Sequence, residues 1–485
     1  MQSKSFFLNL LLKNIVKLSG ILYLFFFPHF LVVASNDTGI VKSNSLYEKD
    51  FLNKDFHAER RQELRDLLPD NSVAIFFSNS IKNRSNDVDF QFHQDPNFYY
   101  LTGLNEPHAL LLVFKSMYTL EGEMCNEALY LQPRDSIKEL WVGARLGEIG
   151  AKNNLGISSS FPNFKFAIHE ISFASLSKVY YTESEDKLKD DARNRGDLYS
   201  LRRHVELKQD TSFANVDKNL LNEMMASLRE VKHKEEIRLM KKAIDITCMA
   251  QTALMQRITP DMTEYQAEAI VEHVFKWEGA ESPGFSSIIG SGANSCVLHY
   301  TENRKQFEES DLVVVDIGAE YHGYSADITR TFPVNGSFTN EQKKIYNIVL
   351  EAEEAGIKSC LPGNKFWAPN VAATNIIRQR LFELGITKEK SDYRKYFMHG
   401  TSHYLGLDVH DVGLYGELEE GNVLTVEPGI YIPEGSDCDP KWWNIGIRIE
   451  DNILITQNGY ELLSECVPKT ISEIEQLMRI KSSYK

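Results

Sequence analysis

Residues 399–411 read HGTSHYLGLDVHD and place three histidines within twelve positions of a chain that contains only thirteen. Imidazole is the side chain that most often binds metals and moves protons near neutral pH. A lone histidine usually packs quietly, but His399, His403 and His410 are interleaved with Gly400 and Gly406, which let the backbone approach a ligand closely. The spacing therefore indicates a chemical site, and other residues must join the imidazoles there.

Two aspartates on neighbouring predicted strands are the first candidates. DLVVVDIG (311–318) predicts a strand with Asp316 near its end, and SADITRTF, from residue 325, predicts a second strand carrying Asp327. If these strands form an antiparallel hairpin that turns at Tyr321 and His322, Asp316 faces Asp327, with Cβ atoms about 5 Å apart. Two buried carboxylates at that distance repel each other, whereas divalent cations between them turn the same arrangement into an attraction.

A second hairpin repeats this theme. NVLTVEPG (422–429) ends in Glu427, one residue and a glycine, and IGIRIEDNILIT (445–456) carries Glu450 on the same face as Arg448, because side chains alternate along a strand. An isolated acidic residue at a strand end is usually a turn residue, so the joint pattern carries the prediction. Four carboxylates and one imidazole are the ligands expected of a two-metal hydrolase. A set so rich in oxygen favours Mn²⁺, with Co²⁺, Fe²⁺ and Zn²⁺ as alternatives.

Four segments together resemble the signature segments of one metallopeptidase family. FMHGTSHYLGLDVHDVG, VVVDIGAEYHGYSADITRTF, LTVEPGIYI and GIRIEDNILIT, in this order, are similar to those of Xaa-Pro aminopeptidases (aminopeptidase P), which have the pita-bread fold. REVKHKEEIRLMKKAID resembles the linker helix of that family, and NFYYLTGLNEPHALLL resembles its N-terminal domain. The resemblance implies hydrolysis of the N-terminal Xaa-Pro bond of peptides that have proline at the second position.

The resemblance also implies roles for individual residues. It implies two divalent metal ions held by five ligands: Asp316, Asp327, His403, Glu427 and Glu450. From the oxygen-rich ligand set we expect these ions to be Mn²⁺. Asp327 and Glu450 would bridge the metals, and Glu427 would orient and deprotonate a metal-bridging water. His299 and His399 would line the pocket for the substrate proline, and His410 would stabilise the tetrahedral intermediate. Arg448 and Tyr431 would hold the ligands and the intermediate in place, as metal sites normally require.

Hydrophobic patterning divides the chain into two folded domains. From 50 to 215, the apolar runs SVAIFFS, NFYYLTG, HALLLVF, EALYLQP and KVYYT predict an α/β domain. From 216 to 475, we expect an α+β pita-bread catalytic domain with internal pseudo-two-fold symmetry, followed by a tail (476–485). A helical pattern runs from Lys218 to about Thr259, and capping-box patterns at Thr263 and Thr339 each announce a further helix. Another helix, VAATNIIRQRLFELG, closes at Gly385.

The amino terminus has the features of an export signal. Residues 1–34 contain lysines but no acidic residue, and GILYLFFFPHFLVVAS forms an apolar stretch that ends in small residues. We expect cleavage after this signal, a short mature tail (35–49), and a periplasmic or secreted protein. The alternative is an uncleaved membrane anchor, since Leu18 to Ala34 is at the short edge of spanning length.

Charge and composition limit the partners and the rival functions. A net charge of −15 disfavours nucleic acid as a partner, and we expect peptide substrates and a homo-oligomer, either a dimer or a tetramer. The nearest alternative function is a prolidase restricted to Xaa-Pro dipeptides, which would need a cationic group for the free carboxylate of the dipeptide. A more distant alternative is a non-catalytic peptide-binding module of the same fold, which the complete set of ligands disfavours.

Overall fold

The computed structural model describes residues 49–181, 194–209 and 215–480. The predicted export signal (1–34) lies outside these residues and stays a prediction. Within the described ranges, no helix has both the length and the apolarity that crossing a bilayer requires.

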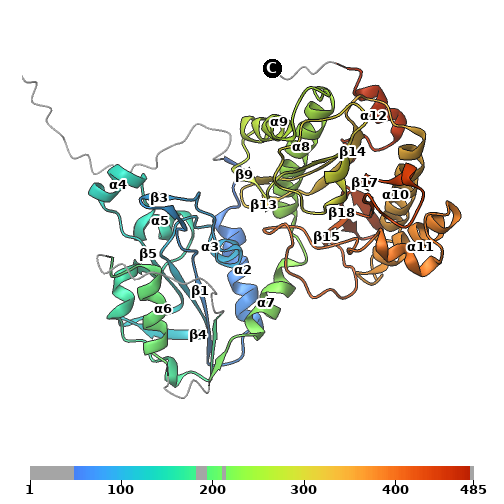
Figure 1. Cartoon of the computed structure of the whole chain (residues 1–485). Coiled ribbons are helices and arrows are strands. Elements are labelled where there is room, and N and C mark those ends of the chain that lie inside the picture. The colour runs from blue at the N-terminus through green and yellow to red at the C-terminus, as the bar shows by residue number, and fades with distance from the viewer. Residues whose placement is uncertain (1–48, 182–193, 210–214, 481–485) are drawn as a thin grey trace, which may run out of the picture. The chain divides into compact units, whose positions relative to one another are not determined.

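The first half of the chain is built on a six-stranded mixed sheet with the order β6-β5-β4-β1-β7-β8 (Figure 1). Every residue of β1 is buried, which explains why its sequence is apolar on both faces. The strands are β1 (Ser72–Phe77), β4 (Leu110–Leu120), β5 (Glu123–Leu131), β6 (Ser160–Pro162), β7 (Lys178–Tyr181) and β8 (Val216–Asp217). The helices are α2 (Lys54–Leu67), α3 (Pro96–Thr102), α4 (Ser136–Val142), α5 (Gly147–Asn154) and α6 (Leu198–Leu207), and β2 (Asn83–Ser85) and β3 (Val88–Asp89) form a small hairpin.

One of the five predicted β-rich runs is a helix. NFYYLTG forms α3 and not a strand, because the Asp95 side chain caps the helix by accepting from the Phe98 N–H (2.8 Å). Pro96 occupies the first turn, and Gly103 ends the helix in the left-handed region with a φ of 69°. These start and stop signals outweigh the strand propensity of the aromatic residues between them.

The long helical pattern after Lys218 is interrupted once. It forms α7 (Leu220–Arg229) and α8 (Lys234–Met255), and the chain between them runs beside the segment that precedes β15. There the Lys232 N–H donates to the Gly421 carbonyl (2.8 Å), and Val231 forms a β-bridge with Asn422. The prediction of one continuous helix was wrong because this long-range pairing uses backbone groups that the helix would need.

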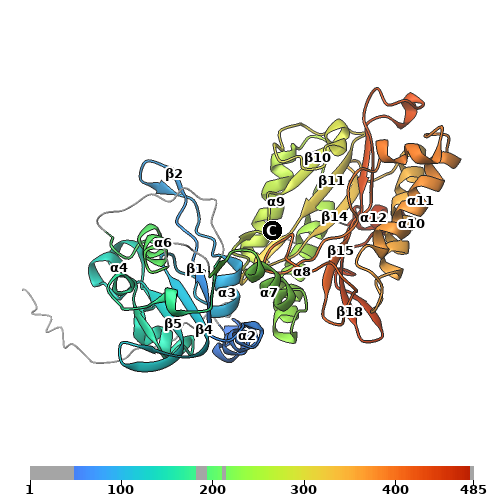
Figure 2. The ribbon, with the colours of Figure 1, turned by 90° about the horizontal axis from the view of Figure 1, so that it is seen from below.

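The second half places its strands between two pairs of helices, as both views show (Figures 1 and 2). The helices are α8, α9 (Glu264–Trp277), α10 (Asn340–Lys358) and α11 (Ala368–Glu383), with α12 (Ile471–Leu477) near the end. Thr263 and Thr339 form the predicted capping boxes of α9 and α10, and Gly385 follows α11 with a φ of 69°. The strands are β9 (Ser282–Pro283), β10 (Ile288–Ser291), β11 (Leu312–Ile317), β12 (Ala319–Tyr321), β13 (Tyr324–Ser325), β14 (Ile328–Pro333), β15 (Val423–Val426), β16 (Gly429–Ile432), β17 (Ile445–Arg448), β18 (Asp451–Thr456) and β19 (Gly459–Leu462).

One expected domain limit falls directly before a strand, and the other falls inside a helix. β8 pairs with β7 in the first sheet, so that sheet continues through Asp217, beyond the expected limit at 215. Helix α12 ends at Leu477, beyond the expected start of the tail at 476. The first sheet and helix α12 each extend two residues beyond the expected limit.

The first predicted hairpin is present, but its register differs by two residues. Asp316 pairs with Thr329, and not with Asp327 as predicted, because the turn is centred on His322 and Gly323. Both of these residues have positive φ angles, 50° and 83°, as a two-residue type I′ hairpin turn requires. A shift of two residues preserves the alternation of side chains, so Asp327 still lies on the face of Asp316, in the diagonal position.

The second predicted hairpin is interrupted at its acidic residues. β15 pairs with β18 through Val426 and Asp451, and β16 pairs with β17 through Gly429 and Arg448. Continuing either register inward places Glu427 opposite Glu450. Both glutamates therefore stand at a gap between two short sheets, where their side chains can turn toward the first hairpin.

Candidate metal centre

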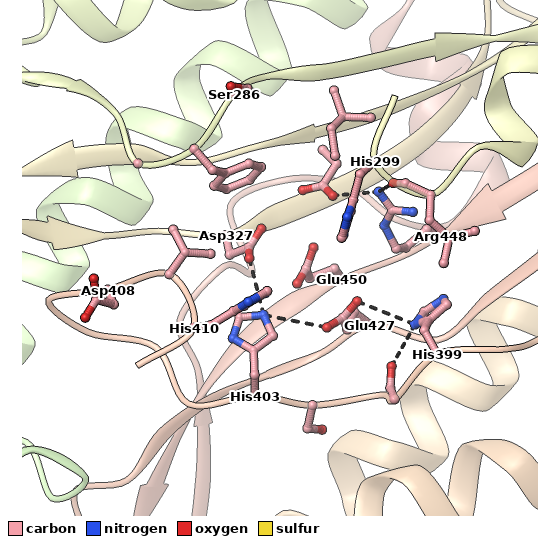
Figure 3. Close-up of a pocket in the computed structure, with 18 of the residues that line it drawn as sticks. Ser286, His299, Asp327, His399, His403, Asp408, His410, Glu427, Arg448 and Glu450 are labelled. Atoms are coloured by element: carbon pink, nitrogen blue, oxygen red, sulfur yellow. Dashed lines mark hydrogen bonds and ion pairs between the residues drawn. The ribbon is translucent and has the colours of Figure 1, made fainter. Parts of the chain in front are cut away.

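A cavity of about 820 Å³ opens above the two acidic hairpins (Figure 3). Its walls include nine of the ten residues predicted for the site: His299, Asp316, Asp327, His399, His403, His410, Glu427, Arg448 and Glu450. The tenth, Tyr431, lies behind the wall and contacts two of them. The structure thus brings together residues that are up to 151 positions apart, from His299 to Glu450.

His403 supplies a nitrogen to the acidic cluster. Its Nε2 lies 3.4 Å from Asp327 Oδ2 and 3.6 Å from Glu427 Oε1 (Figure 3). Its Nδ1 lies 2.9 Å from the Tyr404 carbonyl, which can only accept a hydrogen bond, so Nδ1 carries the proton. The lone pair of Nε2 therefore points at the carboxylates, which is the tautomer that a metal-ligating histidine needs.

The carboxylates are buried with too few partners for their charges. Asp327 and Glu450 are only 5% and 2% exposed, and one ligand atom from each lies with a His403 nitrogen within 4.8 Å. Asp316 Oδ1 and Asp327 Oδ1 are buried without a hydrogen-bond partner. Burial, together with repulsion from Asp316 and Glu427, raises the pKa of Asp327 well above its usual value. Buried oxygens without partners and with mutual repulsion fit divalent cations, which would satisfy both deficits.

The two glutamates of the cluster, Glu427 and Glu450, also have raised pKa values. Burial raises the pKa of Glu427 to about 7, against the opposing effects of His403 and Arg448. Burial and the neighbouring Asp327 also raise the pKa of Glu450 well above its usual value. The protein alone supplies less positive charge than this cluster of carboxylates needs.

A chain of hydrogen bonds connects the cluster to His399. Arg448 Nη2 donates to Asp316 Oδ2 (2.6 Å), and its Nη1 donates to the Tyr431 hydroxyl (2.8 Å). The Tyr431 hydroxyl lies 2.9 Å from His399 Nε2, while His399 Nδ1 lies 2.7 Å from the Gly400 carbonyl. Burial and the charge of Arg448 lower the pKa of His399 to about 4, so its ring is neutral at neutral pH.

The other two predicted histidines face the open part of the cavity. The ring of His410 packs edge-on against His403, with centroids 4.3 Å apart, and burial lowers the pKa of His410. His299 lines the cavity near Arg448, and Phe285 and Val409 contribute apolar surface. This part of the wall offers imidazole rings and apolar groups to a ligand.

Two residues of the site were missed by the sequence reasoning. Thr329 donates its hydroxyl to Glu450 Oε2 (2.6 Å) and accepts from Arg448 Nε (3.2 Å), so it orients both side chains. Asn452 holds Asp327, since its side chain accepts from the Asp327 N–H (3.3 Å) and donates to the Asp327 carbonyl. Thr329 could have been found, because it is two residues from Asp327 and shares its strand face.

Two family models match the chain. Residues 238–457 match the model described as metallopeptidase family M24, and residues 57–178 match aminopeptidase P, N-terminal domain. The aminopeptidase P model therefore matches within the predicted N-terminal domain, and the M24 model matches within the predicted catalytic domain.

Curated and solved proteins agree with these matches. The Xaa-Pro aminopeptidase of Haemophilus influenzae is 38% identical over 446 residues, which cover 88% of this chain and 98% of that protein. The Xaa-Pro aminopeptidase of Escherichia coli is 39% identical over 434 residues, which cover 86% and 96%. The structure of Escherichia coli aminopeptidase P with the inhibitor Pro-Leu superposes with a TM-score of 0.79 at 37% identity, over 88% of this chain and 99% of that one.

Proposed function

Because this chain belongs to the Xaa-Pro aminopeptidase family of M24 metallopeptidases, we propose residue roles and a substrate range for it within that activity. It is a metallopeptidase with an N-terminal α/β domain and a pita-bread catalytic domain. We propose that it cleaves longer peptides with proline second, and not only Xaa-Pro dipeptides.

The hydrogen bonds of Arg448 are the main support for the proposal that the enzyme cleaves longer peptides. Among the described residues that line the cavity, Arg448 is the sole arginine or lysine. It already donates to four groups: Asp316, Tyr431, Thr329 and the Leu298 carbonyl (3.3 Å). A prolidase needs a cation for the free carboxylate of its dipeptide. In this cavity the one arginine is already engaged by protein groups and does not meet that need. Its volume of about 820 Å³ lies in the upper part of the range for ligand pockets, about 300–1,000 Å³, and so leaves room for a peptide.

The five predicted ligands are the groups that would hold two divalent cations, and we propose Mn²⁺ because four of the five offer carboxylate oxygen. Bound cations supply a Lewis acid for the scissile carbonyl and lower the pKa of water. Glu427 lies at the open side of the cluster and takes the proton of the attacking water. His410 faces the cavity beside His403 and donates to the oxygen that becomes negative.

We propose that proline is recognised by the part of the wall that combines imidazole rings with apolar side chains. An Xaa-Pro bond is a tertiary amide without an N–H, so the pocket must recognise the pyrrolidine ring by its shape. We propose that His299 and His399 pack against this ring. His399 is held for this role by the Tyr431 hydroxyl and the Gly400 carbonyl.

A peptide panel tests both substrate proposals. With added Mn²⁺, mass spectrometry should show cleavage of Xaa-Pro-Yaa after its first residue, with Xaa-Ala-Yaa far slower. His299→Ala should lower turnover of Xaa-Pro-Yaa about 10- to 100-fold, by loss of substrate contacts worth about 1–3 kcal/mol. Its metal content should stay unchanged, because His299 touches no ligand group in the cluster.

The matched control is His204→Ala, on α6 and outside the cavity, which should behave as wild type. Cleavage of Xaa-Ala-Yaa as fast as Xaa-Pro-Yaa would contradict the proline pocket. Cleavage of the dipeptide alone would identify a prolidase.

We also propose that the protein is exported. The Cys248–Cys466 disulfide supports this proposal, because disulfides persist mainly in oxidising compartments. Sequencing the amino terminus of protein from its native cell should give a start near Ser35, after the apolar stretch. An intact Met1 in the membrane fraction would instead support the uncleaved anchor. Assembly into a dimer or tetramer stays a prediction.

A further inference from the structure

Behind Glu450, on the side away from the cavity, lies a network of four charged side chains. Arg330 donates to Asp451 (2.7 Å), and Lys469 donates to both Asp451 (2.6 Å) and Glu353 of α10 (2.7 Å). The side chains of Arg330, Asp451 and Glu353 are 0% exposed, and none of the four lines the cavity. Two cations balance two carboxylates, which is the condition under which buried charges are tolerated.

Arg330 uses every hydrogen-bond donor of its guanidinium group. The five acceptors are Pro468 O (3.2 Å from Nε), Thr329 O (3.0 Å from Nη1), Glu450 O (2.6 Å from Nη1), Asp451 Oδ1 (2.7 Å from Nη2) and Val467 O (3.1 Å from Nη2). A guanidinium has five N–H groups in a rigid plane, whereas an ammonium has three on a flexible stem. The side chain thus fixes three chain segments relative to one another: β14, the start of β18 and the segment 466–469.

Glu450 is held from both sides as a result. Its N–H donates to the Thr329 carbonyl (3.1 Å), and its own carbonyl accepts from Arg330. Its carboxylate accepts from the Thr329 hydroxyl. The direction of the Glu450 side chain therefore depends on the position of Arg330 and of the segment 466–469, to which Arg330 donates hydrogen bonds.

That segment is covalently attached to helix α8. Cys466, directly before Val467, forms the disulfide with Cys248, across a sequence separation of 218 residues. On the next turn of α8, Gln251 Nε2 donates to Val315 O and Ile328 O, each at 2.9 Å. These carbonyls are one residue from Asp316 and one residue from Asp327, so α8 also holds the first hairpin.

We propose that the Cys248–Cys466 disulfide and Arg330 together form a brace that sets the position of Glu450 relative to Asp316 and Asp327. One end of the brace is α8, which contacts the first hairpin. The other end is the segment 466–469, which Arg330 joins to the second hairpin. The brace rests on the proposed metal site, and it keeps ligands from the two hairpins at a separation that suits the cations. Arg330 is a positioning residue, because it touches neither the cavity nor a substrate.

Metal release tests the brace. Protein from an oxidising compartment is loaded with Mn²⁺ and placed in excess EDTA well below its unfolding temperature, and the retained Mn²⁺ is measured after timed desalting. Cys248→Ala/Cys466→Ala should release Mn²⁺ about 10-fold faster, and Arg330→Lys about 10- to 100-fold faster, as when groups that orient metal ligands are removed. Thiol titration of unfolded wild type should find four free thiols among the six cysteines.

The matched control is Arg61→Lys. Arg61 is also a buried arginine, paired with Glu127 in the first domain, so its replacement should lower stability without changing Mn²⁺ release. A double cysteine variant that unfolds more easily but releases Mn²⁺ at the wild-type rate would overturn the brace, as would six free thiols. Wild-type protein that neither retains Mn²⁺ nor cleaves Xaa-Pro-Yaa would contradict the proposed function instead.

Discussion

Asp327→Asn should remove most of the bound metal and lower the cleavage of Xaa-Pro-Yaa by on the order of 1,000-fold, since Lewis-acid stabilisation is worth several kcal/mol and each 1.36 kcal/mol is tenfold in rate. An amide has the shape of the carboxylate but lacks the negative charge that two cations require. Asp327 is 5% exposed and its Oδ1 has no hydrogen-bond partner, so little water reaches this position to stabilise the cations in place of the carboxylate. Metal analysis and steady-state kinetics on the same sample measure both effects.

Asp408→Asn provides the matched control for this variant. Asp408 lines the same cavity and is also an aspartate, but it pairs with Arg229 (3.1 Å) and is 43% exposed. The control should keep both its metal and its activity within a few-fold of wild type. A fully loaded and fully active Asp327→Asn protein would refute the assignment of Asp327 as a ligand.

Removal of the metal should abolish activity and make the stability of the protein decrease as pH rises. Without cations, burial raises the pKa of Glu427 from about 4.5 to about 7, so the folded protein binds a proton that the unfolded chain has released. A carboxyl with a raised pKa favours folding at low pH and disfavours it as pH rises from about 4.5 to 7. The unfolding free energy of the metal-free protein should fall by up to about 3 kcal/mol across this interval from Glu427 alone.

Denaturant unfolding of chelator-treated protein at several pH values measures this loss. Addition of Mn²⁺ should restore both activity and stability at pH 7, by about 4 kcal/mol at a concentration 1,000 times the dissociation constant. The loaded protein serves as the control, and its stability should show little of this pH dependence because the cations satisfy the carboxylates. Equal pH profiles with and without metal would contradict a cation site at this cluster.

Local sequence patterns predicted which residues lie together around the cavity. The four predicted carboxylate ligands line one cavity, because strand alternation assigns a face to each of them without reference to the rest of the fold. His299, His399, His403 and His410 line the same cavity from segments outside the strands. The prediction that Asp316 faces Asp327 was wrong by two residues, yet both reach the same face, since an even shift leaves the alternation unchanged. The capping boxes at Thr263 and Thr339 were likewise correct, because a cap depends on residues within one turn.

Contacts between distant segments were decided by the tertiary structure. The break before α8 follows from the pairing of Lys232 with Gly421, and the brace behind Glu450 joins residues from 248 to 469. No local pattern marks Arg330 as a partner of Glu450, because its role depends on how the two hairpins pack. The sequence by itself therefore determined which side chains could bind metal and which way each faces its own strand. Only the packed structure decided how far apart they stand and what holds them there, because separation depends on long-range contacts that no short segment contains.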